Sequence, residues 1–158
     1  MQTDKRNIKR WIHFFMAALF VSGITAIPVK AEINLLYKWT EDIDFIRPWM
    51  EKLYIGINET SGKYPFLFYG YDWLAFAHIV LAILFIGPLR DPVKNKWVIE
   101  FGIIACLLII PFALIAGYAR GIPAGWRLRD CSFGVIGIIP LLICMKKINR
   151  LEIFETKK

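Results

Sequence analysis

Four apolar stretches divide the chain, and each is followed within two residues by a proline or a basic residue. They cover residues 11–27, 66–87, 97–118 and 129–145. A helix needs about 20 apolar residues to cross the hydrocarbon core of a bilayer, with a range of about 17 to 25. The middle two stretches have this length, and the first is near the lower limit. The apolar run of the fourth begins near Cys131 and is short, unless it includes Trp126 to Asp130 as an interfacial turn. The pattern predicts four membrane-spanning helices.

The long segment between the first two stretches is too polar to span a membrane, but it is periodic. Apolar side chains recur three and four residues apart at Ile43, Ile46, Trp49, Met50, Leu53 and Tyr54, which is helical spacing. Pro48 suits the first turn of a helix. We expect an amphipathic outer helix within residues 31–57, either lying in the membrane interface or packing on the outer ends of the spans.

Composition agrees with a membrane protein. Hydrophobic residues make up 57% of the 158 residues and the mean hydropathy is +0.49, whereas soluble domains are about 45–50% apolar. The predicted fold is all-α: a single integral membrane domain over residues 1–158, built as a four-transmembrane-helix bundle.

The net charge of +7 predicts orientation. Lysines and arginines gather before the first span, between the second and third, and after the fourth. If all four segments cross, these groups lie on one side, and the positive-inside rule assigns that side and both termini to the cytoplasm. The basic residues form no single stripe and are not interleaved with aromatic residues. The charge therefore indicates contact with membrane lipids and no nucleic-acid partner.

The first stretch allows a second interpretation. A basic start, an apolar run and then "VKA" at 29–31 are also the pattern of a cleavable signal peptide. Cleavage there would leave three spans with the new N-terminus outside. We expect the helix to be retained.

A charged group precedes the fourth apolar stretch, in the sequence "GWRLRD" at 125–130. We expect Asp130 to head the fourth span, where the helix dipole favours a carboxylate. The arginines are predicted to pair with aspartates or to bind lipid phosphates. The predicted lipid or partner contact at the outer face comprises Asp72, Arg120, Trp126, Arg127, Arg129 and Asp130. The alternatives are that this group merely closes the bundle or forms an active site.

Small residues predict where helices approach closely. Gly134, Gly137 and Leu141 share the helix face below Asp130, and the two glycines leave a groove for another helix. Ala18, Ser22 and Ala26 recur every four residues in the first span, and Ala113 and Gly117 do so in the third. These faces predict a compact bundle or contact with partner subunits.

Few ionisable residues lie inside the predicted spans. His78 falls near mid-bilayer, and Ser22 and Cys106 lie at similar depths, which predicts an intramembrane polar cluster of Ser22, His78 and Cys106. His78 then either joins two helices through a hydrogen bond or contacts haem or a quinone. An inner pair of His13 and Glu100 is also expected.

The cysteines, Cys106, Cys131 and Cys144, lack metal-type spacing and cannot all be paired. We therefore expect no metal and no cofactor, with haem at His78 as the alternative.

Two stretches carry a resemblance to a protein family. They are "FYGYDWLAFAHIVLAILFIGPLRDPVKNKWVIEFGIIAC" (68–106) and "GIPAGWRLRDCSFGVIGIIPLLICMKKI" (121–148). They resemble an uncharacterised family of small bacterial, Bacteroidota-type four-span integral membrane proteins with no assigned activity. The resemblance implies the bacterial inner membrane and transfers no functional residues.

The functional expectation is a non-enzymatic inner-membrane protein. It would be an accessory or scaffold subunit of a membrane complex, with protein partners and a lipid-contacting outer Arg/Asp patch. One alternative is a redox or proton-handling protein that uses His78. The other is a membrane enzyme acting on a lipid headgroup at the outer face.

Overall fold

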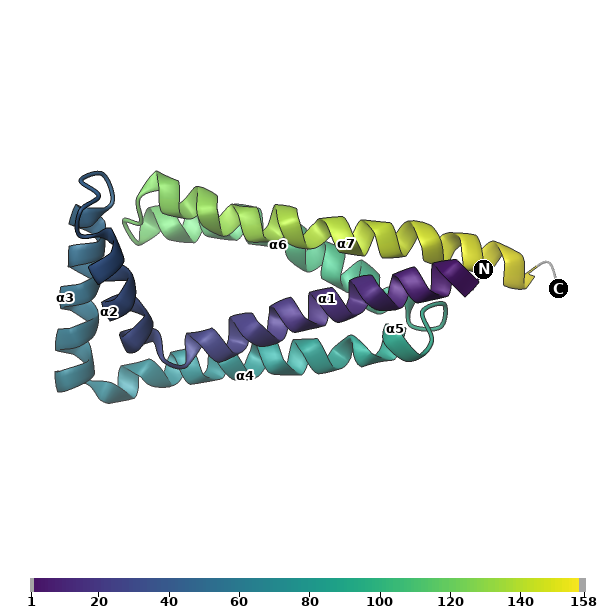
Figure 1. Ribbon diagram of the computed structural model, residues 1–158, viewed down its shortest axis with the longest axis horizontal. Coiled ribbons are helices and arrows are strands. Elements are labelled where there is room, and N and C mark those ends of the chain that lie inside the picture. The colour runs from purple at the N-terminus through teal and green to yellow at the C-terminus, as the bar shows by residue number, and fades with distance from the viewer. Residues whose placement is uncertain (1, 157–158) are drawn as a thin grey trace. The chain divides into compact units, whose positions relative to one another are not determined.

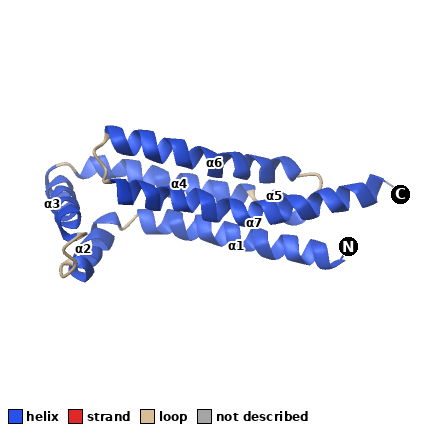
Figure 2. Cartoon of the chain, turned by 90° about the horizontal axis from the view of Figure 1, so that it is seen from above, coloured by secondary structure: helices blue, strands red, loops and turns tan. Residues whose placement is uncertain are grey.

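The computed structural model describes residues 2–156 and is helical along most of that length, with no strand among these residues (Figures 1 and 2). The elements are α1 (Gln2–Ala26), α2 (Val29–Thr40), α3 (Arg47–Lys63), the short 3-10 helix η1 (Pro65–Phe68), α4 (Tyr69–Leu84), α5 (Ile86–Arg90), α6 (Lys96–Ala119) and α7 (Ala124–Thr156). The predicted all-α class is confirmed.

Three helical segments in the described part are long and apolar enough to cross a membrane. They are Pro65–Arg90, which joins η1, α4 and α5, then α6, and then most of α7, Ala124–Phe154. The first predicted span passes this test only as a bent pair, α1 with α2, at a bend of 90°. The chain is thus compatible with a multi-pass membrane protein of three to four spans. The closed four-helix bundle and the direction of the termini stay predictions.

The chain divides into two compact units. Unit 1 contains the chain up to Ala18 and from Ala82 onward, and unit 2 is Leu19–Leu81. α1 contributes its first part to unit 1 and its last part to unit 2. Each unit is described separately below.

The core of unit 1 includes the contact of the first part of α1 with α7 and with Phe85. Ile8 and Ile12 are fully buried, as are Leu141 and Ile148 on α7. The rings of Phe15 and Phe85 lie 4.8 Å apart between centroids. Because these α1 side chains supply core, the first turns of α1 are a structural part of unit 1.

The two long helices of unit 1 pack closely through glycines. α6 and α7 run side by side in both ribbon views (Figures 1 and 2). A Cβ placed on Gly134 would lie 2.5 Å from the carbonyl oxygen of Cys106, and one on Gly137 would lie 3.1 Å from the Cys106 Sγ. The groove predicted at Gly134 and Gly137 is therefore confirmed, and α6 of the same chain fills it.

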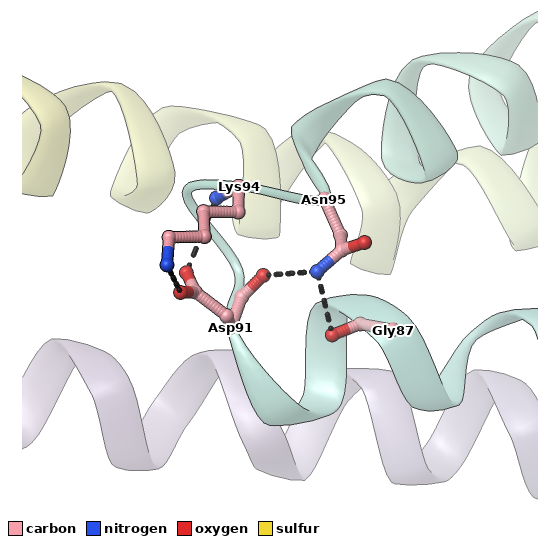
Figure 3. A network of polar contacts seen from close by, with 4 residues as sticks. All are labelled: Gly87, Asp91, Lys94 and Asn95. Carbon is pink, nitrogen blue, oxygen red and sulfur yellow. Dashed lines mark hydrogen bonds and ion pairs between the residues drawn. The ribbon is translucent and has the colours of Figure 1, made fainter.

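A network of polar contacts holds the turn between α5 and α6 (Figure 3). The Asn95 side-chain amide donates to the carbonyl oxygens of Gly87, at 3.1 Å, and Asp91, at 2.9 Å. The Asp91 carboxylate accepts the backbone N–H of Lys94 at 3.1 Å and pairs with the Lys94 Nζ at 3.8 Å. The Gly87 and Asp91 carbonyls also accept the backbone N–H groups of Asp91 and Asn95, so the Asn95 amide adds a second bond to each and holds the turn in place.

Unit 2 replaces the expected single amphipathic helix with a helical hairpin. α2 and α3 lie side by side, and the rings of Tyr37 and Tyr54 stack at 4.6 Å. Asn58 Nδ2 donates to Asn34 Oδ1 at 2.8 Å. The helix expected over 31–57 breaks at residues 41–46, so the apolar face of α3 packs partly against α2. Pro48 does lie in the first turn of α3, as predicted.

Candidate functional site: the Arg–Trp patch

The predicted charged group lies at the turn that joins α6 to α7. α6 ends in a Schellman motif: the N–H of Ile122 bonds to the Gly117 carbonyl at 2.9 Å, and that of Gly121 bonds to the Tyr118 carbonyl at 3.1 Å. Gly121 has a φ of +66°, a backbone conformation that residues other than glycine rarely adopt. The turn brings the end of α6 beside the first turns of α7. We call Trp126, Arg127, Arg129 and Asp130 the Arg–Trp patch.

Arg127 packs against α6. A Cβ on Gly117 would come within 2.6 Å of the Arg127 Cγ, so the absence of a side chain there makes room for the arginine. Its Nη1 donates to the Leu114 carbonyl at 3.4 Å, and its guanidinium carbon lies 5.7 Å from the centre of the Tyr118 ring. The Nε is buried and has no hydrogen-bond partner among the described residues. Arg127 is thus chiefly a tie between the two helices.

Arg129 is the accessible cation of the patch. Its guanidinium carbon lies 4.1 Å from the centre of the Trp126 ring, a cation–π distance. Its Nη2 lies 3.6 Å from Asp130 Oδ1, while 54% of its side chain is exposed. Ring and carboxylate orient the guanidinium and leave donors facing outward. Planar guanidinium donors match the oxygens of a phosphate.

The position expected for Asp130 at the head of the fourth span is wrong. α7 begins at Ala124, and no acidic residue lies in its first turn. The helix dipole acts within that first turn, so it does not account for Asp130. Pro123 and the helix-compatible residues after it start the helix earlier than the apolar run indicated. The partner of Asp130 is Arg129.

The other two residues predicted at this site occupy different elements. Arg120 is exposed and caps the end of α6. Asp72 lies in the first turn of α4, in unit 2, where it lines a hollow of about 220 Å³ with Tyr69, Trp73 and Phe76. An ion pair between Asp72 and the arginines stays a prediction.

The predicted intramembrane cluster is divided between the units. His78 Nδ1 lies 2.8 Å from the Leu74 carbonyl oxygen of its own helix, and the Ser22 carbonyl accepts a bond from Thr25. Both belong to unit 2, whereas Cys106 packs on the glycines of α7 in unit 1. A common cluster of Ser22, His78 and Cys106 therefore stays a prediction.

The predicted inner pair is not formed by a direct contact. His13 Nδ1 lies 2.7 Å from the Lys9 carbonyl oxygen of its own helix, and the Glu100 side chain is exposed. Each residue is in unit 1, yet no hydrogen bond or ion pair joins them in the described structure. Within residues 2–156, no group of three His, Cys, Asp or Glu side chains is placed to hold a metal ion.

Sequence reasoning missed two glycines that set helix contacts, Gly23 and Gly102. A Cβ on Gly23 would lie 2.9 Å from the Ala75 carbonyl oxygen, and one on Gly102 would lie 2.9 Å from Leu141. The small-residue position predicted at Gly117 does make a close contact, and it accommodates the Arg127 side chain. The signal was available, since a glycine inside an apolar helix usually marks close approach. In the first span, however, the four-residue spacing of alanine and serine led to a predicted contact at Ser22, one position before Gly23.

The patch offers guanidinium donors beside an aromatic ring and a carboxylate, and the exposed guanidinium of Arg129 can donate to the oxygens of a phosphate. Comparison of the chain with protein-family models, with curated proteins and with solved structures found no match.

Proposed function

We propose that this chain is a non-enzymatic inner-membrane protein, an accessory or scaffold subunit of a membrane complex, whose Arg–Trp patch binds lipid headgroups. Both termini would lie in the cytoplasm. The observation that carries the proposal is Arg129: a guanidinium held on a tryptophan ring, half exposed, at the end of two apolar helices. Tryptophan favours the headgroup level of a membrane, where the anion available to such a group is a lipid phosphate.

The lateral surface of α6 supports the membrane part of the proposal. Exposed apolar side chains recur at helical spacing at Ile104, Leu107, Leu108, Phe112 and Ile115. Phe112 is 75% exposed and Ile115 is 70% exposed. Such a stripe of large side chains is stable beside lipid tails or a partner helix, and unstable in water.

The contacts of the charged groups in the Arg–Trp patch support a binding role over a catalytic one. Arg127 is engaged with α6, and Asp130 is engaged with Arg129, so the groups of the patch hold one another and are suited to binding. His78 is bonded to its own helix, and no specific observation favours the redox alternative over this one.

The test compares the full-length protein with Arg129→Gln after gentle extraction from its native membrane. Copurified proteins and lipids are identified and quantified by mass spectrometry. An exposed cation near an anionic surface contributes about 1 kcal/mol, so Arg129→Gln should bind phospholipid at the patch roughly fivefold more weakly and retain measurably less of it, while the partner proteins still copurify. Lys52→Gln removes an exposed cation from α3 and should change nothing.

Two results would contradict the proposal. Equal phospholipid retention by the wild type and Arg129→Gln would remove the lipid contact. A wild-type protein that copurifies without any defined partner, and that carries haem or quinone absorbance, would replace the scaffold role with the His78 alternative.

A further inference from the structure

We propose that the end of unit 1 where α1 begins and α7 ends binds the phosphate groups of anionic phospholipids. The surface consists of Arg6, Lys9 and Arg10 on α1 with Lys146 and Arg150 on α7. We call it the terminal basic surface. It shares no residue with the Arg–Trp patch.

Packing of α1 on α7 places these cations at one end of unit 1. The Lys147 Nζ lies 3.0 Å from Asp4 Oδ1, and the Cys144 thiol donates to the Ile8 carbonyl at 3.8 Å. Ile8 and Ile148 are fully buried. The buried apolar residues of each helix face the core. The basic residues that lie between them in the sequence therefore face outward.

The terminal basic surface carries an excess of positive charge. All five of its cations are exposed. The nearby carboxylates are engaged elsewhere in unit 1: Asp4 with Lys147, Asp91 with Lys94, and Glu152 with Lys96. Glu100 remains an exposed carboxylate on α6. Among the side chains that the structure describes, these anions are too few to neutralise five exposed cations, and an external anion would do so.

The surface is also hollowed on the α1 side. Thr3, Lys5, Arg6 and Lys9 line a hollow of about 420 Å³. A phosphate group fits such a volume, and the lining provides a hydroxyl together with ammonium and guanidinium donors. Clusters of four to eight lysines and arginines beside a membrane-spanning helix are a recognised mode of binding anionic lipids.

Tryptophans indicate that the anion is a lipid. Trp11 directly follows Arg10 on α1, and Trp97 directly follows Lys96 at the start of α6; both are exposed. Exposed tryptophans at the ends of apolar helices favour the headgroup level. The terminal basic surface therefore begins at the depth where lipid phosphates lie.

The test measures binding of phosphatidylglycerol to the delipidated full-length protein, by native mass spectrometry at low ionic strength, with phosphatidylcholine as the neutral lipid. Each cation near an anionic surface contributes about fivefold in affinity. Arg6→Gln/Lys9→Gln/Arg10→Gln should bind phosphatidylglycerol at least tenfold more weakly than the wild type and bind phosphatidylcholine equally. Arg6→Lys/Arg10→Lys, which keeps the charge, should bind like the wild type.

The controls separate this site from net charge and from the Arg–Trp patch. Lys30→Gln/Lys38→Gln/Lys52→Gln removes the same charge from unit 2 and should bind normally. Arg129→Gln tests the patch alone, so the two sites can fail independently. If the α1 variant does not fold, Lys146→Gln/Arg150→Gln tests the same surface from α7, with the same direction expected.

Three outcomes would overturn the inference. The first is wild-type binding by a folded α1 or α7 variant. The second is equal weakening in the unit 2 control, because the effect would then be one of total charge. The third is displacement of the lipid by inorganic phosphate at equal concentration, since the surface would then bind a soluble anion.

Discussion

The contact between Gly134 and α6 is the sharpest test of the packing in unit 1. In Gly134→Ala, the new Cβ would lie 2.5 Å from the carbonyl oxygen of Cys106, whereas real Cβ atoms essentially never come within 3.0 Å. That oxygen belongs to the helix backbone and cannot rotate away. α6 and α7 must therefore separate by about half an ångström or more, which loosens the close-packed contacts along their length.

The cost can be bounded from these contacts. Overpacking a tight interface costs about 1–3 kcal/mol, and the immovable carbonyl places this case in the upper half of that range. Alanine in place of glycine returns at most about 1 kcal/mol of helix propensity. We expect Gly134→Ala to lower the free energy of unfolding by about 1–2 kcal/mol.

The assay is unfolding of the purified protein in mixed micelles with increasing sodium dodecyl sulfate, followed by far-ultraviolet circular dichroism. Gly125→Ala is the matched control, because it lies in the same helix and a Cβ there meets no heavy atom within 4 Å. It should be neutral or slightly stabilising. If Gly134→Ala proves as stable as Gly125→Ala, the close approach of α6 and α7 is refuted.

The same assay checks three further expectations. Gly23→Ala should destabilise by about 1 kcal/mol, less than Gly134→Ala, because its Cβ would lie 2.9 Å from the Ala75 carbonyl oxygen and alanine returns some helix propensity; no loss relative to Gly70→Ala, which meets nothing within 4 Å, would contradict this. Gly121→Ala should cost about 1–2 kcal/mol because φ is +66°, and an unchanged midpoint would mean that the turn adopts another conformation. His78→Leu should change stability by only about 0.6 kcal/mol, the average for a hydrogen bond within membranes. Loss of partner copurification in folded His78→Leu would instead give this residue a functional role.

The positions of several helices follow from local patterns in the sequence. The apolar runs near 66–87 and 97–118 correspond to Pro65–Arg90 and α6, since the length of an apolar run in a helix is a property of the run itself. Pro48 similarly marked the start of α3. Gly134 and Gly137 indicated close packing because a missing side chain is visible in any sequence.

The partners of those faces were decided by the tertiary structure. In a span that is apolar all round, periodicity carries little information about which side meets another helix. Which face of a helix meets its neighbour depends on how closely the two backbones can approach. In the structure the contact is made at Gly23 and not at its neighbour Ser22, and Cys106 packs against Gly137.

The different roles of the charged residues could also be assigned only from the tertiary structure. From the sequence, Arg127 and Arg129 are equivalent members of one group. Their side chains point to different surroundings: Arg127 lies along Gly117 of α6, and Arg129 lies on the Trp126 ring with its donors exposed. The sequence alone determined that cations gather at the ends of apolar helices, because lipid excludes charge from their middles. Only the contacts between distant segments determined which of these cations tie helices together and which remain available to bind.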